Sequence, residues 1–306
     1  MTALASATDR RWIDTALAWY FVSVWGCGFL ASKVALQYAA PFTMLSLRYL
    51  LGVLCLVPVL LATRPAWPAS RREFGHVVVA GLLMHAIHLS GSHYSQYLGL
   101  SAGITALVMS LQTLATALIA SRWMGDRLDA RQWLGVVLGL GGVALVVWHK
   151  IDVRELPLGS LVGLAFGITA ITLGTLYQKT WCPRVDLKAA TFIQFAASAL
   201  ALAPLAFAVE GARVEWAWQL FAAYAYLVIL ASILATNALN VLMRHGEATR
   251  VTSLIYLTPI FAVALEYPMF GVMPSTLSMA GIAVTCAGVA MVTWRSRRAP
   301  LAAAVD

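Results

Sequence analysis

Apolar residues in this chain are grouped in ten long runs, and a short break containing proline, glycine or charged residues separates each run from the next. Each run is long enough to cross a hydrocarbon core about 30 Å thick as one helix of about 20 residues. The pattern therefore predicts an all-α polytopic membrane protein with ten transmembrane helices. Their expected extents are 13–36, 42–62, 74–98, 102–123, 131–148, 158–181, 187–208, 217–240, 250–269 and 276–294.

The sequence also contains the same pattern twice. Ser101–Trp148 aligns with Glu247–Trp294 without a gap, at a constant shift of 146 residues. Matched apolar positions alone would be weak evidence, but glycines, prolines and lysines match in the same register. These pairs are Gly28 and Gly174, Lys33 and Lys179, Pro58 and Pro204, Gly135 and Gly281, and Gly142 and Gly288. We therefore expect two copies of one unit.

Each copy holds five expected spans, and this number has a consequence for orientation. Because five is odd, the second copy must enter the membrane in the opposite direction to the first. We therefore predict two five-helix inverted repeats, residues 1–148 and 158–306, joined by a linker at 149–157. Many secondary transporters are built in this way, with the substrate site near the middle of the membrane between the repeats.

Composition supports a membrane protein and narrows the classes of function. Hydrophobic residues make up 61% of the 306 residues and charged residues only 11%, which is too few for the surface of a soluble domain. The four cysteines have neither disulfide nor metal-ligand spacing, and no phosphate-binding loop with its Lys-Ser/Thr ending is present. We therefore expect no metal, no cofactor and no ATP-driven chemistry.

The net charge of +8 is distributed in a way that predicts orientation, not nucleic-acid binding. Sixteen basic residues lie at the two termini and in the even-numbered connections, whereas only Lys33, Lys150, Arg154 and Arg213 lie on the opposite side. Basic residues accumulate on the cytoplasmic side of membrane proteins. Both termini are therefore expected to be cytoplasmic, with the chain inserted in the inner membrane.

The opening of the first copy, WGCGFLASKVAL at Trp25–Leu36, and the glycine-rich span that closes each copy resemble the drug/metabolite transporter superfamily. Within it the chain is most similar to the EamA-like ten-helix exporters, and among these to the bacterial aromatic amino acid exporters. The resemblance implies export of amino acids or related metabolites by alternating access, without ATP. One departure concerns the leucine–polar–proline turn of the family, which is present at 257–259 but lacks its proline at 111–113.

The third expected span carries the largest set of polar residues at membrane depth. His85, His88, Ser92 and Gln96 fall on one helical face, and the second copy has only apolar residues at the matching positions. Polar groups are costly against lipid and usually face a cavity or another helix. The stripe either lines the substrate path, where a histidine can take up a proton, or hydrogen-bonds to neighbouring helices in a packed interior.

Other spans contribute further candidates for the substrate site. The fourth and ninth spans bring Gln112 and Tyr256 to the expected middle of the membrane, and the eighth span adds Asn237 as a group that binds polar atoms of an amino acid. The first and sixth spans add Trp25 and Tyr177. Trp25 lies away from both interfaces, and either forms an aromatic wall for the substrate or packs in the core.

Three residues are candidate hinges. Gly28 and Gly174, which the repeat matches, are expected to allow close approach or bending of their helices. Proline removes a helix hydrogen bond, so Pro259 either acts as a hinge beside the site or only bends its helix.

Charged residues within the spans leave two interpretations open. Arg48 lies about 10 Å inside the second span, at 1.5 Å per residue, and Glu266 lies in the ninth span at a compatible depth. The two are expected either to pair with each other or to bind the carboxylate or ammonium group of a substrate. Lys33 and its counterpart Lys179 either anchor a gate or extend their charge to the interface.

Together these features predict a secondary transporter that exports amino acids, aromatic or of broad range, or related small metabolites, by facilitated diffusion or proton antiport. No nucleophile–base set indicates an enzyme. The expected partners are the small-molecule substrate and the lipid bilayer, without nucleic acid, and the protein is expected to be a monomer or homodimer. One alternative is an exchanger of phosphorylated sugars or nucleotide-sugars, which needs several cations in the middle of the membrane. The other is an intramembrane lipid-modifying enzyme, which needs clustered acids or metal ligands.

Overall fold

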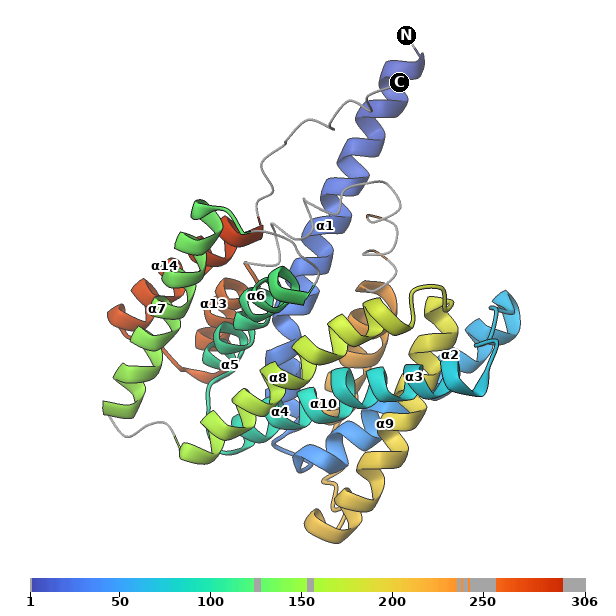
Figure 1. Ribbon diagram of the computed structural model, residues 1–306. Coiled ribbons are helices and arrows are strands. Elements are labelled where there is room, and N and C mark those ends of the chain that lie inside the picture. The colour runs from blue at the N-terminus through green and yellow to red at the C-terminus, as the bar shows by residue number, and fades with distance from the viewer. Residues whose placement is uncertain are drawn as a thin grey trace.

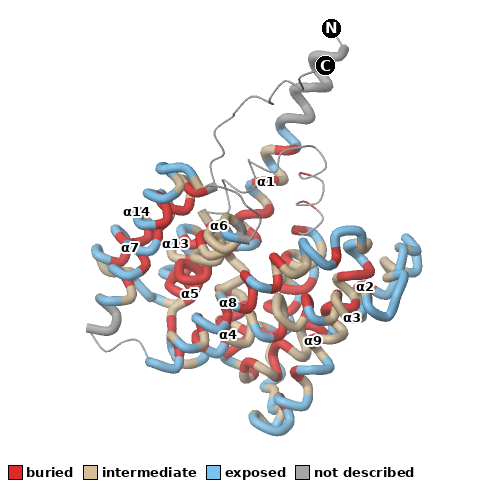
Figure 2. The backbone as a smooth tube through the Cα atoms, viewed as in Figure 1, coloured by how far each residue is buried: buried red, intermediate tan, exposed pale blue. Residues whose placement is uncertain are grey.

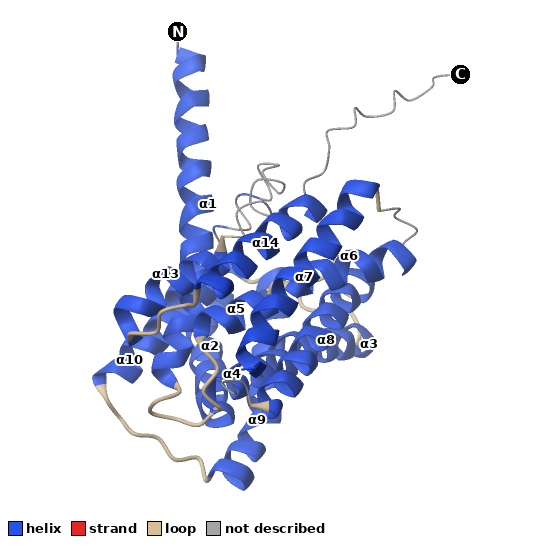
Figure 3. Ribbon diagram, turned by 90° about the vertical axis from the view of Figure 1, so that its left-hand side faces the viewer, coloured by secondary structure: helices blue, strands red, loops and turns tan. Residues whose placement is uncertain are grey.

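The computed structural model describes residues 2–123, 128–152, 157–235, 238, 242 and 257–293, and most of these residues are helical (Figures 1 and 3). Within this part of the chain the extended structure is limited to an isolated bridge between Ala39 and Val214. The helices are α1 (Thr2–Ala35), α2 (Pro41–Thr63), α3 (Arg71–Gly81), η1 (Leu82–Ile87), α4 (His88–Tyr97), α5 (Ala102–Met109), α6 (Leu111–Trp123), α7 (Ala130–Asp152), α8 (Leu158–Trp181), α9 (Leu187–Glu210), α10 (Trp218–Ala225), η2 (Tyr226–Ala235), α13 (Thr258–Phe270) and α14 (Thr276–Thr293).

Eight helical stretches of the described chain are long and apolar enough to cross a membrane, and α14 contains a shorter apolar helix. Three consecutive elements, α3, η1 and α4, form one of these stretches, from Arg71 to Tyr97. The prediction of an all-α membrane protein is confirmed. The number of ten spans stays a prediction, because parts of the expected eighth and ninth spans lie outside the described residues.

The outer surface of the bundle is apolar, as a lipid environment requires. Trp12, Leu61, Trp148, Leu200 and Phe207 are each at least 72% exposed. Figure 2 shows the buried residues on the sides of the helices that face one another, and the exposed residues on the outside and in the connections. Hydrophobic side chains are therefore exposed on the surface that lipid acyl chains would contact.

The helices of the two copies occupy matching positions. A shift of 146 residues carries the start of α2 at Pro41 to Leu187, where α9 begins, and carries Trp12–Ala35 of α1 to Leu158–Trp181, which is α8. Helices also pack as a twofold relation requires: α2 packs on its counterpart α9, and α7 packs on its counterpart α14. In the same way α3 and η1 pack on α8, as α10 and η2 pack on α1.

The contact between α7 and α14 shows this twofold relation at individual residues. Gly135 approaches the carbonyl of Gly288, and Gly142 approaches the carbonyl of Gly281. Because Gly281 and Gly288 are the counterparts of Gly135 and Gly142, the two contacts exchange under the repeat, as they do in a symmetric interface. The expected small-residue packing of these two helices is therefore present, since no side chain separates their backbones.

A π-helical segment occurs at matching places in both copies. The shift of 146 carries η1 to residues 228–233, which lie within η2. π-helical turns are rare and are frequent at functional sites, because they leave a backbone carbonyl without its usual partner. His85, one of the predicted site residues, lies in η1.

The fourth expected span is interrupted, although the sequence predicted one continuous helix from 102 to 123. The interruption is at Ser110, where α5 ends and α6 begins. The hydroxyl of Ser110 donates to the carbonyl of Leu107, and the hydroxyl of Thr113 donates to the carbonyl of Ser110. These side chains compete with the backbone for the helix carbonyls, which explains the local break. In the second copy α13 begins at the equivalent place.

Candidate substrate site

The bundle has two ends, which we name after residues that lie there. The Lys33 end holds the end of α1, the start of α2, the start of α5 and the end of α9. The Arg71 end holds the start of α3, the end of α8 and the start of α9. Positions along each helix can then be compared by their depth from either end.

Glu266 of α13 joins the two copies at the Lys33 end. Its side chain is only 3% exposed and lies 2.7 Å from the ammonium of Lys33 on α1. The same carboxylate accepts hydrogen bonds from the backbone N–H groups of Ala102 and Gly103, at 2.7 and 2.9 Å, in the first turn of α5. A carboxylate is favourable there because the helix N-terminus carries unpaired N–H groups and a partial positive charge.

Glu266 therefore pairs with Lys33, and not with Arg48. The ammonium of Lys33 binds Glu266 and lies 4.5 Å from the centre of the Phe270 ring, and its role as a gate or interface anchor stays a prediction. The repeat does not supply this ion pair at the other end of the bundle. Lys33 has a lysine as its counterpart, at 179, but the counterpart of Glu266 is Ala120.

A second carboxylate joins the copies at the same end. Glu210, the last residue of α9, accepts hydrogen bonds from the N–H groups of Phe42 and Thr43 and from the Thr43 hydroxyl, at 2.7 to 2.9 Å. The backbone of Glu215 also donates to the carbonyl of Tyr38 at 2.8 Å. Charged and backbone groups of both copies therefore close the Lys33 end together.

The helix α4, which ends near the Lys33 end, carries polar side chains that are buried without a hydrogen-bond partner. Ser92 is fully buried, and His93 and Gln96 are 2% and 5% exposed. In the described protein His93 approaches only the backbone carbonyl of Leu89 on its own helix, and the hydroxyl of Ser92 and both amide atoms of Gln96 have no partner. The hydroxyls of Thr172 on α8 and Thr258 on α13 are in the same situation. Such a group of atoms is what a polar solute or water needs on the walls of its site.

The predicted histidines lie in the protein interior, but each has one partner. His85 lies 3.3 Å from the amide oxygen of Gln194 on α9, and His88 lies 3.2 Å from the carbonyl of Gly167 on α8. The amide nitrogen of Gln194 in turn donates to Gln178 at 3.1 Å. The two histidines thus make the helix-to-helix hydrogen bonds of the packing alternative, while the other positions of the stripe remain unsatisfied.

Sequence reasoning missed His93 because it followed only one row of the third span. His93 lies one residue after Ser92 and three residues before Gln96, so it occupies the adjacent row of the same helical face. The spacing of His93 from Ser92 and Gln96 could therefore have predicted it as a site residue.

The remaining predicted site residues lie in different places. Trp25 is 45% exposed and packs on Phe21 of its own helix. Gln112 is partly buried just beyond the break at Ser110. Tyr177 lies near the Arg71 end, where its hydroxyl is 2.6 Å from His76. Asn237 and Tyr256 lie outside the described residues.

The three candidate hinges have unlike surroundings. Pro259 is buried in the first turn of α13, a position where proline is well tolerated because the N–H it lacks would have no helical partner. A Cβ atom at Gly28 would meet no atom within 4 Å, whereas one at Gly174 would lie 2.6 Å from the Met84 side chain and 3.0 Å from that of Leu83. Gly174 therefore allows α8 to pack closely against η1, and the hinge role of all three residues stays a prediction.

Alanine at these two matched glycines is expected to have unequal effects. Gly174→Ala should lower the thermal stability of the purified protein, because Leu83 and Met84 of η1 must move, at a cost of about 1–3 kcal/mol. Gly28→Ala should leave stability unchanged or raise it, because alanine favours helix by about 1 kcal/mol. Thermal unfolding followed by tryptophan fluorescence would measure both, and equal effects would contradict the different surroundings of the two glycines.

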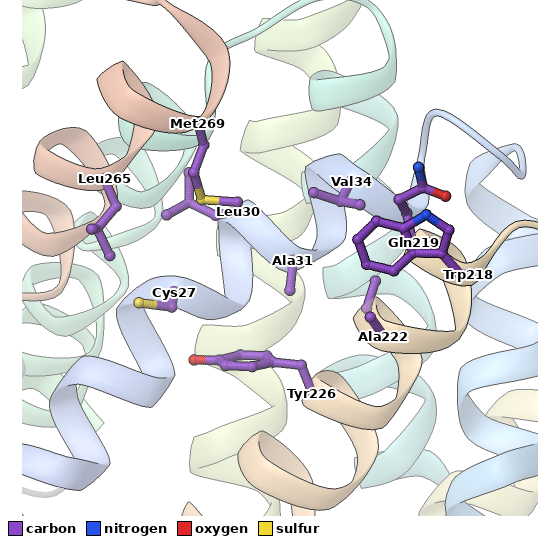
Figure 4. A pocket seen from close by; sticks show the side chains of 11 residues that line it. Cys27, Leu30, Ala31, Val34, Trp218, Gln219, Ala222, Tyr226, Leu265 and Met269 are labelled. Atoms are coloured by element: carbon purple, nitrogen blue, oxygen red, sulfur yellow. The ribbon is translucent and has the colours of Figure 1, made fainter.

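An apolar groove of about 360 Å³ lies between α1, α10, η2 and α13 (Figure 4). Ala31 and Ala222 stand on its two sides. Their counterparts in the other half of the repeat are Tyr177 and His76, which are hydrogen-bonded to each other and fill the matching space. Small side chains at one end and large rings at the other make the two membrane faces of the bundle different.

Among the described residues, no group of three or more His, Cys, Asp or Glu side chains could hold a metal ion. Two matched sets of membrane-length helices, with buried polar side chains between them, define the class of this protein as a polytopic membrane protein of the two-repeat transporter type. The sequence model of the EamA-like transporter family matches residues 15–148 and again 157–294. The chain therefore belongs to the EamA-like transporter family, as its resemblance to the drug/metabolite transporter superfamily predicted.

Individual relatives cover almost the whole chain at low identity. The "Uncharacterized transporter YvbV" of Bacillus subtilis (strain 168) is 25% identical over 93% of this chain and 92% of its own length. The "Uncharacterized inner membrane transporter YedA" of Escherichia coli (strain K12) is 24% identical over 88% and 87%. A "Probable amino-acid metabolite efflux pump" of Salmonella typhimurium is 21% identical over 90% and 93%. A solved crystal structure with 19% identity shares the fold, with a TM-score of 0.65 over 94% of this chain and 99% of that one.

Proposed function

We propose that this protein is a secondary transporter that exports amino acids or related small metabolites across the inner membrane by alternating access. The observation that carries the proposal is the group of buried polar atoms without partners on α4, α8 and α13, which lies between the two copies. An efflux pump for amino-acid metabolites and an inner membrane transporter among the relatives support the substrate class and the location.

The charges of the chain assign a direction to this mechanism. The basic residues around the Arg71 end make it the cytoplasmic end, so the Lys33 end faces outward. Release of an exported solute then requires the Lys33 end to open. The contacts that must separate are those of Glu266 with Lys33 and α5, and those of Glu210 with the start of α2.

Flux measurements on the purified full-length protein in proteoliposomes test this proposal. A panel of amino acids, sugar phosphates and cationic drugs should give flux for at least one amino acid, without ATP. Absence of flux for every amino acid would refute the proposed substrate class. Flux of sugar phosphates alone would support the exchanger alternative, which Arg48 favours as a buried cation but which needs further cations.

Variants of three residues predicted from the sequence test whether those residues contribute to the substrate site. Trp25→Ala, His85→Ala and Tyr256→Ala should each lower the flux of the transported amino acid, by about tenfold where a hydrogen bond or ring contact worth about 1.4 kcal/mol is lost. Expression and thermal stability should stay close to those of the wild type for Trp25→Ala and Tyr256→Ala, whereas His85→Ala should also lower stability because it loses the hydrogen bond with Gln194. Unchanged flux in all three would mean that the substrate binds elsewhere in the bundle.

A further inference from the structure

Arg48 is a charged residue deep in α2 that the closure of the Lys33 end does not use. It lies about 10 Å from the start of the helix at Pro41. Met44 precedes it by one turn and Gly52 follows it by one turn, and both are buried, so Arg48 is on the side of α2 that faces the protein. It is partly buried itself, and the phenol rings of Tyr49 and Tyr224 lie close to its charge.

No acidic side chain in the described part of the chain neutralises Arg48. The buried carboxylate of Glu266 forms its ion pair with Lys33, at 2.7 Å. The carboxylate of Glu210 is bound to the start of α2, at Phe42 and Thr43. A charge held at membrane depth without a partner is strongly unfavourable, and such residues usually bind an ion or solute that the protein carries.

Arg48 lies on a helix that packs against α4, where the polar side chains without partners are found. Its guanidinium is close enough to the imidazoles of His85, His88 and His93 to interact with them electrostatically. The hydroxyl of Ser92 and both amide atoms of Gln96 are unsatisfied, although each side chain is at least nine-tenths buried. A cation and unsatisfied hydrogen-bonding groups therefore lie on two helices that pack against each other.

The repeat shows that the fold does not need a charge at this position. The counterpart of Arg48 is Gln194, which is neutral and 4% exposed. Its amide oxygen lies 3.3 Å from His85, and its amide nitrogen donates to Gln178 at 3.1 Å. In the second copy this position thus holds a neutral residue with hydrogen-bond partners in the protein. In the first copy it holds a cation without an acidic partner in the described part of the chain.

We propose that Arg48 binds the carboxylate group of the substrate, and that the unsatisfied side chains of Ser92 and Gln96 on α4 offer hydrogen bonds to the rest of it. A guanidinium offers two parallel N–H donors that match the two oxygens of a carboxylate. One unpaired positive charge balances one negative charge, whereas a phosphate dianion needs a second cation, and Lys33 is already bound to Glu266. This assignment deepens the proposed function and rests on it, because it names the substrate group that the proposed site recognises.

Binding to the purified full-length protein tests this role without requiring transport. The probes are L-phenylalanine, L-leucine and L-threonine, each paired with its carboxamide, and glucose 6-phosphate, and the readout is thermal stabilisation as a function of probe concentration. In the wild type at least one amino acid should bind about 30-fold or more tightly than its carboxamide, the factor expected for a buried charge pair. Arg48→Gln should lose this preference, and Arg48→Lys should keep part of it because the charge remains but the two-donor geometry is lost.

Arg213→Gln, at an exposed arginine in the connection after α9, is the matched control and should leave the preference unchanged.

The assignment is overturned if no amino acid stabilises the wild type, if acid and carboxamide bind equally, or if Arg48→Gln keeps the preference. Stabilisation by glucose 6-phosphate alone that depends on Arg48 also overturns the carboxylate assignment. Should Arg48→Gln not fold, Arg48→Lys and the wild-type preference still decide the question. Amino acids that bind in an Arg48-dependent way but give no flux would refute the proposed function and leave the binding assignment standing.

Discussion

Glu266→Ala is expected to destabilise the protein by about 3 kcal/mol or more, because three groups lose their common acceptor. The ammonium of Lys33 loses its counter-ion, and the N–H groups of Ala102 and Gly103 lose the oxygens that cap α5. Equilibrium unfolding of the purified protein in mixed micelles would measure the loss. Glu215→Ala, at an exposed acidic residue near the same end of the bundle, is the control and should change stability by less than about 0.5 kcal/mol.

Exchanging the two charges should not restore stability. In Lys33→Glu/Glu266→Lys the ion pair could form again, but a lysine at 266 has no acceptor for the N–H groups of Ala102 and Gly103. It would also place a positive charge against the positive end of α5. Lys33→Met alone should cost less than Glu266→Ala, since the carboxylate keeps its two backbone donors. Full recovery in the exchanged variant would contradict this view and would show that only the ion pair matters.

The partner of Glu266 illustrates where sequence reasoning ends. Helix lengths and the repeat follow from local patterns, because apolar runs and matched glycines are visible along one dimension. The sequence also gives the depth of each charge, and by depth alone Arg48 was as acceptable a partner for Glu266 as any. Depth does not give the position of a helix around the bundle, and Lys33 and Glu266 are 233 residues apart in the chain.

The candidate site was predicted in part for the same reason. The stripe of His85, His88, Ser92 and Gln96 could be predicted from helical spacing. Ser92 and Gln96 are buried, and the two histidines are partly buried. Which of them the protein satisfies could not be read, because the partners Gln194 and Gly167 come from other helices. Their identity depends on packing between the copies, which no local pattern encodes.

Differences between the copies carried more information about function than similarities did. Arg48 against Gln194 is a change of charge at matched positions, and it marks the proposed substrate-binding residue. A second difference is one of side-chain size. The groove is open where the first pair is Ala31 and Ala222, and the matching space is filled where the counterparts are Tyr177 and His76. Both differences are present in the aligned copies, so comparing the halves residue by residue would have found them.

Gly288→Ala is expected to weaken the packing of α14 on α7 and lower the stability of the protein by about 1–3 kcal/mol. A Cβ atom there would meet the backbone nitrogen of Gly139 and would lie 2.5 Å from the carbonyl oxygen of Gly135. Backbone atoms cannot rotate out of the way as a side chain does, so the two helices must separate. This cost outweighs the gain of about 1 kcal/mol that alanine brings to a helix.

Gly141→Ala is the matched control on α7. A Cβ atom at Gly141 meets no atom within 4 Å, so the same change should leave stability unaltered or increase it. Unfolding of both variants in mixed micelles, compared with the wild type, measures the difference. Equal stabilisation by the two substitutions would mean that α7 and α14 do not pack through their glycines.

Combining Gly288→Ala with Gly142→Ala tests whether the two glycine contacts belong to one interface. A Cβ atom at Gly142 would lie 2.6 Å from the carbonyl of Gly281 and 2.7 Å from the backbone nitrogen of Thr285, so Gly142→Ala alone should also be destabilising. Once one substitution has pushed the helices apart, the second encounters a gap that is already wider. The double variant should therefore lose less stability than the sum of the two single losses, whereas strict additivity would require the helices to yield locally at each glycine.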